Sequence, residues 1–273
     1  MGRLFVAEVV HARSESQDLQ WHFDAIGRLG DAQALGAACR PGLEVDVKAM
    51  LAPAQYLAPG ALWWVFDWQG ALGQAANCKC KHRQPVPPLG WEPGKGSVLL
   101  IDEIDKAEAD LPNGLLETLG NGGFAVPYLD EPVAIPEGVP SPLVVITTNE
   151  ERELPAAFVR RCLVLHLRLP DGDPARRDQP EAVRRQDLVD WLLARGKDHF
   201  GQRIDCEVLE QAAQQLWTDR QQARNLGLSP PGQAEYLDLL RALDRLAHAD
   251  AAGQKDLLVR IQGFALRKFA GLC

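Results

Sequence analysis

Two apolar runs, each ending in polar side chains, constrain the fold of this chain more than any other feature. Residues 97–101 (Ser-Val-Leu-Leu-Ile) lead directly into Asp102 and Glu103. Residues 143–146 (Leu-Val-Val-Ile) lead through a pair of threonines to Asn149. Such short continuous runs are typical of parallel strands that are buried on both faces of a sheet. Because α/β proteins bind ligands at the carboxyl edge of their strands, we expect these polar side chains to meet there.

The segments around these two runs predict an α/β domain over residues 1–170. Further strands, two of them paired as a hairpin, are expected at residues 4–10, 124–126, 133–135 and 163–167. A helix is expected to begin near Asp18, because Leu19, Phe23, Ile26 and Leu29 recur at helical spacing. Other helices are expected at residues 109–119 and just after Pro155.

The pattern changes from strands to helices beyond residues 170–174, a turn-rich linker that reads Pro-Asp-Gly-Asp-Pro. Apolar positions three and four apart predict helices at residues 181–194, 206–224, 233–248 and 254–269. We therefore expect an all-helical domain over residues 171–273, following the α/β domain.

The two acids at the end of the first run suit the hydrolysis of a nucleoside triphosphate. That reaction needs one acid to hold Mg²⁺, usually through water, and another to orient the attacking water. Asp102 and Glu103 fit these tasks in that order, and the neutral amide of Asn149 suits a water or a γ-phosphate. The alternative for the acids alone is that they end a strand and begin a turn.

Arg160 and Arg161 follow the predicted helix that opens at Pro155. A guanidinium at this helix end suits the arginine-finger role, in which it stabilises charge in the nucleotide site of a neighbouring subunit. A solvated pair of surface arginines is the alternative.

Together these residues resemble the MoxR family of AAA+ ATPases. The resemblance is most specific over residues 97–170, where the chain is similar to the family's Walker B segment, its following helix and hairpin, its sensor 1 and its arginine-finger segment. Weaker similarity extends over nearly the whole chain, at residues 18–33, 56–63 and 230–243. The resemblance implies a AAA+ parallel-sheet core followed by a helical lid.

The resemblance also implies a function: ATP-driven, chaperone-like remodelling of other proteins, with ATP and Mg²⁺ as cofactors. Glu103, Asn149, Arg161 and Arg160 would be catalytic residues, with Arg161 acting on the next subunit, and Asp102 would hold Mg²⁺ through water. Self-association into a hexameric ring is implied, as is a partner with a von Willebrand factor A domain. Arg224 is the best sensor-2 candidate in the lid, although it is equally well explained as a helix-end cation.

One element of the family is absent from residues 1–273. P-loop ATPases carry G-x-x-x-x-G-K followed by Ser or Thr between a strand and a helix, where backbone amides and the lysine cradle the phosphates. The nearest string, residues 90–97, has the wrong spacing and runs into a strand. We therefore expect an AAA+ core that lacks its first strand and P-loop, because residues 4–10 resemble the family's second strand. The alternative function is a non-hydrolysing AAA+-like scaffold or interaction subunit.

Charge and hydropathy exclude other classes of partner. The formal net charge is −8, from 37 acidic and 29 basic residues, which disfavours binding to nucleic acid. The N-terminal apolar run is interrupted by Glu8, and no run approaches the roughly 18 residues that span a bilayer, so we expect a cytoplasmic protein without membrane contact.

The six cysteines are expected to be reduced thiols in that compartment. Cys78, Cys80 and His82 lie in a proline-rich segment, residues 77–95, that favours an irregular, exposed loop. They could hold a soft metal, but the Cys-x-Cys spacing is unusual for structural zinc and favours an unliganded loop.

Overall fold

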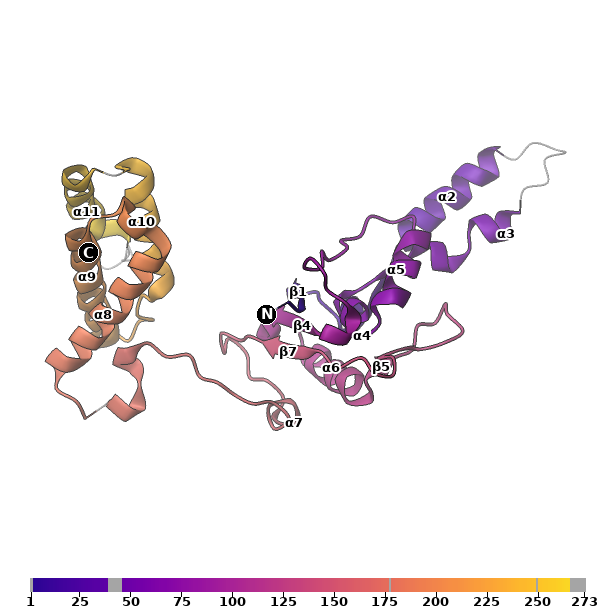
Figure 1. Cartoon of the computed structure of the whole chain (residues 1–273), viewed down its shortest axis with the longest axis horizontal. Coiled ribbons are helices and arrows are strands. Elements are labelled where there is room, and N and C mark those ends of the chain that lie inside the picture. Colours follow the sequence, from indigo (N-terminus) through magenta and orange to yellow (C-terminus); the bar gives the residue numbers. More distant parts are fainter. Residues whose placement is uncertain (1, 39–45, 177, 249, 266–273) are drawn as a thin grey trace. The chain divides into compact units, whose positions relative to one another are not determined.

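The computed structural model describes residues 2–38, 46–176, 178–248 and 250–265. The chain divides into two compact units, Met1–Val164 and Leu165–Cys273 (Figure 1). The first unit is α/β and the second is helical. The division precedes the predicted linker at residues 170–174.

The sheet of the first unit consists of three parallel strands, in the order β1 (Leu4–Val9), β4 (Ser97–Asp102) and β7 (Leu143–Ile146). The central position of β4 and the expected strands at residues 4–10 and 143–146 are thus confirmed. Ile101 is paired with Glu8 on one side and with Ile146 on the other. The strands therefore end together at one edge of the sheet.

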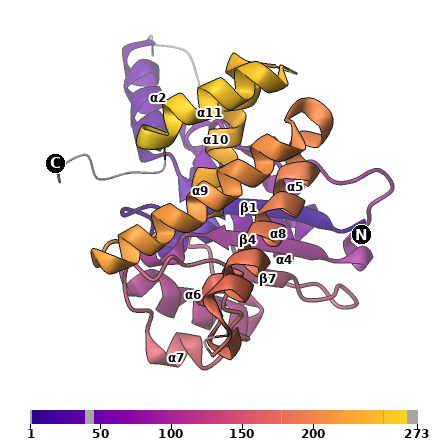
Figure 2. The ribbon, with the colours of Figure 1, turned by 90° about the vertical axis from the view of Figure 1, so that its left-hand side faces the viewer.

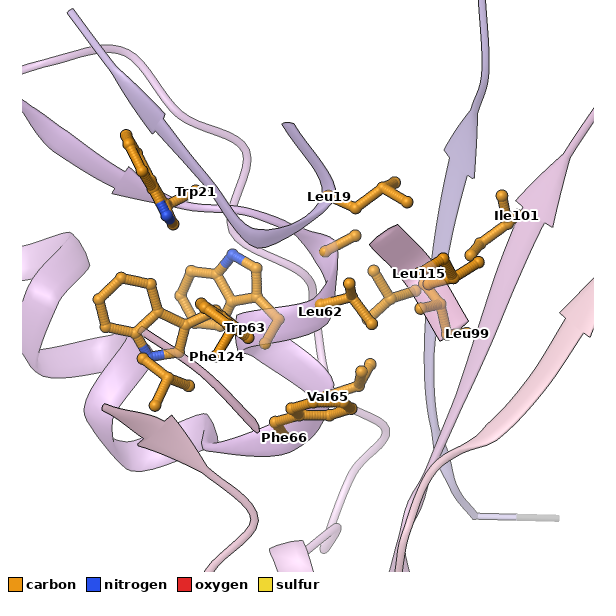
Figure 3. Close-up of a cluster of buried hydrophobic side chains, with 14 of the residues drawn as sticks. Leu19, Trp21, Leu62, Trp63, Val65, Phe66, Leu99, Ile101, Leu115 and Phe124 are labelled. Carbon is orange, nitrogen blue, oxygen red and sulfur yellow. The ribbon is translucent and has the colours of Figure 1, made fainter. Parts of the chain in front are cut away.

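Helix α4 (Ala61–Phe66) packs against one face of this sheet, and all of its residues are buried. Figure 3 shows Leu99 and Ile101 of β4 among the buried side chains of this helix, which include Leu62 and Val65. The apolar sequence of α4 is therefore accounted for by the core, because a helix that is apolar on all sides must be buried on all sides.

The opposite face of the sheet is apolar but exposed. The register places Phe5, Val98 and Leu143 in one row and Ala7, Leu100 and Val145 in the next. Among the large members, Phe5 is 57% exposed, Leu143 53% and Val145 42%. We call these six residues the open face. The expectation that residues 97–101 are buried on both faces of the sheet is therefore wrong for one face, where Val98 and Leu100 are only half-buried.

The predicted helix beginning near Asp18 is also wrong beyond Gln20. Helix α1 (Ser16–Gln20) ends where β2 (Trp21–Phe23) begins, and a separate helix, α2 (Ala25–Ala38), follows. Strand β2 pairs with β3 (Leu57–Pro59), and the ring of Phe23 stacks on that of Tyr128 at 4.6 Å. These long-range contacts override the helical spacing of the apolar residues in the sequence. Ile26 is 85% exposed, so it does not belong to a buried helix face.

The remaining elements of the first unit follow the predicted pattern closely. The hairpin of β5 (Gly123–Phe124) with β6 (Val133–Ala134) is confirmed, as are helices α6 (Asp110–Asn121) and α7 (Ala156–Val159), the latter preceded by Pro155. Residues 78–92 connect α5 (Trp68–Asn77) to the turn before β4 without a helix or strand. The helix α3 (Val47–Met50) and the 3-10 helix η1 (Pro53–Tyr56) complete the segment before β3.

The strand predicted at residues 163–167 is absent. These residues are extended loop, and Leu163, Leu165 and Leu167 are at least 80% exposed. A strand needs a neighbouring backbone to satisfy its amides and carbonyls. No described strand lies beside this segment, which the boundary between the two units crosses. The apolar pattern of residues 163–167 alone was therefore insufficient to predict a strand.

The second unit contains the helices α8 (Glu181–Phe200), α9 (Cys206–Asn225), α10 (Gln233–Leu246) and α11 (Ala251–Ala265), which are labelled in Figure 2. Leu192, Leu209 and Leu240 are fully buried between them. The four predicted helices are confirmed, except that residues 266–269 lie outside the described part of the chain. Within that part, no helix is both long and apolar enough to cross a membrane.

Candidate functional site

The carboxyl edge of the sheet gathers the polar residues that follow β4 and β7. Asp102 ends β4, and Glu103 follows it. The side-chain amide of Asn149 donates to Oε1 of Glu103 at 3.3 Å. The structure therefore brings Asp102, Glu103 and Asn149 together at the ends of two adjacent strands.

Thr147 joins this group, although sequence reasoning gave it no role. Its Oγ1 donates to Oδ1 of Asp102 and accepts from the backbone N–H of Glu103 at 2.9 Å. A signal was available, because Thr147 directly follows β7 just as Asp102 follows Ile101, the partner of Ile146. One hydroxyl thus holds both acids in position, and no described residue engages the second carboxylate oxygen of Asp102.

Glu103 has a left-handed backbone, with φ 58° and ψ 48°. This conformation costs a non-glycine residue about 1–2 kcal/mol. In this strained turn, the side chain of Glu103 lies between two polar partners. Oε1 accepts from Asn149, and Oε2 forms an ion pair with Nζ of Lys106 at 2.5 Å. The hydrogen bond to Glu103 raises the pKa of Lys106.

Asp105 fixes the loop that carries Asn149. It is buried, and its carboxylate accepts from the backbone N–H groups of Glu151 at 2.8 Å and Asn149 at 3.4 Å. Burial acts to raise the pKa of Asp105, but these hydrogen bonds, with one from Thr148, outweigh burial and lower it. The left-handed conformation of Glu150, with φ 60°, lies within the same loop.

We predict that Asp105→Ala lowers the free energy of unfolding by about 1–3 kcal/mol at pH 7, because it removes the charged acceptor of the backbone N–H groups of Asn149 and Glu151. The folded-state pKa is depressed, so the stabilisation is present above the unfolded-state value of about 3.9 and is lost as pH falls through the folded-state pKa. Denaturant titrations, followed by the fluorescence of the first unit's tryptophans, should show the difference from wild type shrinking below about pH 4.

Glu108→Ala is the control for this experiment, since Glu108 forms only an exposed ion pair with Arg152. Such pairs contribute about 0–1 kcal/mol. An equal loss of stability in the two variants would contradict the role of Asp105.

The two arginines after α7 do not join the acids. Both are exposed, and Nε of Arg160 donates to the carbonyl of Ala156 in its own helix at 3.2 Å. Neither forms an ion pair with Asp102 or Glu103. The structure thus leaves the guanidinium of Arg161 on the surface, without a described hydrogen-bond partner.

Arg224, the sensor-2 candidate, lies at the end of α9 in the second unit. Its guanidinium pairs at 2.8 Å with Oδ2 of Asp171, whose side chain is completely buried. Arg220, one helical turn earlier, binds the same carboxylate through two bonds of 2.8 and 2.9 Å and also donates to the carbonyl of Pro231. Sequence reasoning missed both Asp171 and Arg220, and it assigned Arg224 without this partner.

The Cys-x-Cys segment lies after α5. The sulfurs of Cys78 and Cys80 are 2.7 Å apart, and Nδ1 of His82 lies 3.0 Å from the carbonyl of Cys80. Among the described residues, no three His, Cys, Asp or Glu side chains are grouped to hold a metal. Cys80 and His82 line a cavity of about 840 Å³ that also borders β1.

The string at residues 90–97 has no phosphate-cradle geometry. Its residues Pro93–Lys95 form a 3-10 helix, and Gly96, with φ 76°, turns the chain into β4. A phosphate cradle requires amides at the start of a helix, whereas here a strand follows.

No protein-family model matches this chain, and no curated protein matches its sequence.

Proposed function

We propose that Asp102, Glu103 and Asn149 form the hydrolytic half of an ATP site, and that the protein is a MoxR-type AAA+ remodelling subunit. The observation that carries this proposal is the contact of Asn149 with Glu103 at 3.3 Å, at the carboxyl edge of two adjacent parallel strands. An acid pair and a neutral amide at such an edge are suited to a metal, a water and a phosphoryl group.

Each side chain has a distinct task in this proposal. Asp102 keeps one carboxylate oxygen free for Mg²⁺-bound water, while its other oxygen is held by Thr147. Oxygen donors of this kind fit Mg²⁺, which neutralises charge on the phosphates when bound. Glu103 orients the attacking water, and its ion pair with Lys106 must open for it to do so. Asn149 positions that water or the γ-phosphate.

The sheet leaves room for the phosphate-binding element. Among the described strands, β7 pairs only with β4, and the open face carries exposed apolar side chains. Parallel sheets are normally covered by helices on both faces. The strand, loop and helix that the resemblance places before residue 1 would supply such a cover. This supports the AAA+ core as the finer description of the α/β unit.

The resemblance also implies how the subunits of the protein would assemble. Subunits would associate into a hexameric ring in which Arg161 of one protomer reaches the ATP site of the next, with the second unit as the lid. The exposed position of Arg161 is compatible with a role in a neighbouring site. A protein with a von Willebrand factor A domain would be the partner, in the cytoplasm.

A non-hydrolysing scaffold is the second candidate function. Two observations favour it: residues 1–273 contain no P-loop, and the water-orienting acid is paired with Lys106. The retention of two acids and an amide in contact favours hydrolysis instead, since a scaffold has no need of them.

We predict that the 273-residue chain binds Mg²⁺-ATP more weakly than micromolar and hydrolyses it negligibly. The acids have no phosphate cradle to act against, and the cradle supplies much of the affinity for a nucleotide. Isothermal titration calorimetry and a phosphate-release assay measure the two quantities. A tight, saturable isotherm would show that this chain holds the phosphates without a P-loop and would contradict the prediction.

The coding DNA upstream of Met1 can distinguish the two candidate functions. An in-frame P-loop there, together with ATP turnover that Glu103→Gln abolishes in the longer product, would establish the ATPase. A longer product that binds its partner but leaves ATP intact would establish the scaffold.

A further inference from the structure

Cys78 and Cys80 are arranged for a reaction with each other. Their sulfurs are 2.7 Å apart, close to the bond length of about 2.04 Å in a disulfide. The backbone at Cys78 is extended, with φ −80° and ψ 131°. The chain bends at Cys80, where the two side chains meet. Both thiols are half-buried and therefore remain accessible to a small molecule.

Lys79, between the two cysteines, is fixed to the rest of the first unit. Its backbone N–H donates to the carbonyl of Gln55 at 2.8 Å, and its Nζ donates to the carbonyl of Met50 at 2.8 Å and to the hydroxyl of Tyr56 at 3.3 Å. These bonds hold the central residue in place. The two sulfurs are therefore brought together before any reaction, which lowers the entropic cost of closing a ring between them.

The surroundings of Cys80 hold the proton on its thiol. Burial, with the hydrogen bond and charge of Cys78, raises the pKa of Cys80 to about 12. Cys80 therefore keeps its proton at neutral pH and is not the first nucleophile. When the Cys78 sulfur becomes part of a covalent bond, it no longer contributes its hydrogen bond or its electrostatic effect to Cys80. Two of the causes that hold the proton on Cys80 are thereby removed.

We propose that Cys78 and Cys80 form a reversible thiol–disulfide exchange site for low-molecular-weight disulfides. The Cys78 thiolate attacks one sulfur of glutathione disulfide, forms a mixed disulfide and expels a glutathione thiolate. Cys80 then loses its proton, attacks the Cys78 sulfur and expels the second glutathione thiolate. The protein dithiol loses two electrons and two protons, and one glutathione disulfide becomes two glutathione thiols.

The surroundings of the pair fit this substrate class. Lys81 and Arg83 are exposed beside the thiols and offer positive charge to the carboxylates of glutathione. The cavity of about 840 Å³ beside Cys80 gives space for a small peptide disulfide. Because the new ring would contain only residues 78–80, we expect a labile disulfide of the regulatory type. The inference is independent of ATP hydrolysis.

Equilibration with glutathione redox buffers tests this proposal. In excess glutathione disulfide, intact mass spectrometry of the alkylated protein should show the loss of two hydrogens and of two alkylatable thiols. Peptide mapping with a protease that does not cleave at lysine should place the new bond between Cys78 and Cys80. Reduced glutathione should reverse the change.

Single-serine variants provide the sharpest comparison. Cys78→Ser and Cys80→Ser each lack the second sulfur, so they should accumulate a glutathione adduct on the remaining cysteine to a level at least about tenfold above wild type. Cys162→Ser is the matched control, because Cys162 is also half-buried and should leave ring formation unchanged. Thermal melts confirm that the variants fold.

Three outcomes would overturn the proposal. They are a persistent glutathione adduct on the wild-type pair without ring closure, a bond from either cysteine to a different cysteine, and no modification of the pair under conditions that oxidise Cys162.

Discussion

Replacing Arg161 by alanine is expected to slow ATP turnover by about 10³-fold while leaving ATP affinity nearly unchanged, in a form of the protein that also carries the phosphate-binding loop. The guanidinium of Arg161 is exposed at the end of α7 and does not contact the acids of its own chain. Its proposed action is on the neighbouring protomer, where it stabilises charge that develops during phosphoryl transfer. Steady-state phosphate release and nucleotide titration separate the two effects.

Assemblies that mix two variants test whether Arg161 acts in the site of its own subunit or in that of its neighbour. Combining Arg161→Ala subunits with Glu103→Ala subunits should partly restore hydrolysis, because some interfaces then pair an intact Glu103 with an intact Arg161 from its neighbour. Arg160→Ala is the matched control, since the side chain of Arg160 is bonded to its own helix. Absence of rescue in demonstrably mixed rings, or equal losses for the two arginines, would assign both a structural role.

Replacing Asp171 by alanine is expected to destabilise the second unit by about 3–5 kcal/mol, the usual effect of removing one partner from a buried ion pair. The Asp171 side chain is completely buried, and that of Arg220 is only 6% exposed. The substitution leaves the Arg220 guanidinium buried without its counter-charge. Denaturant unfolding followed by hydrogen exchange in α9 measures the loss within this unit.

Asp173→Ala is the matched control, because Asp173 pairs with Arg176 at an exposed position, 3.6 Å away. Its loss should cost no more than about 1 kcal/mol. Arg224→Ala should also cost less than Asp171→Ala, since the bidentate contact of Arg220 remains. A loss from Arg224→Ala equal to that from Asp171→Ala would show that Arg224 is the principal partner, and would weaken its assignment as a nucleotide sensor.

The sequence predicted those elements whose signals are local. Each of these elements has its own periodicity or turn residues: strands β4 and β7, the hairpin, and helices α6 and α8. Strand β2 was missed because its partner, β3, lies far along the chain and the three residues Trp21–Phe23 are too few to give a decisive strand pattern. The strand expected at residues 163–167 failed for the complementary reason, because its pattern is strand-like but no described strand lies beside it.

The residues of the candidate site also divide into those with a local sequence signal and those without one. Asp102, Glu103 and Asn149 could be found from the ends of apolar runs, because adjacent parallel strands end together. Thr147 was overlooked, since a threonine at a strand end is ordinary until the register places its hydroxyl beside a carboxylate. The pairing of Asp171 with Arg220, 49 residues apart, could not be deduced from spacing at all.

The open face has a practical consequence for anyone who purifies this chain. Six apolar positions lie in two adjacent rows on one face of the sheet, and Phe5, Leu143 and Val145 among them are more than 40% exposed. A contiguous exposed apolar surface is a site of self-association when nothing covers it. Net negative charge opposes that association through repulsion, which salt screens. The colloidal behaviour of the chain should therefore depend on ionic strength, with dilute salt favouring the dispersed protein.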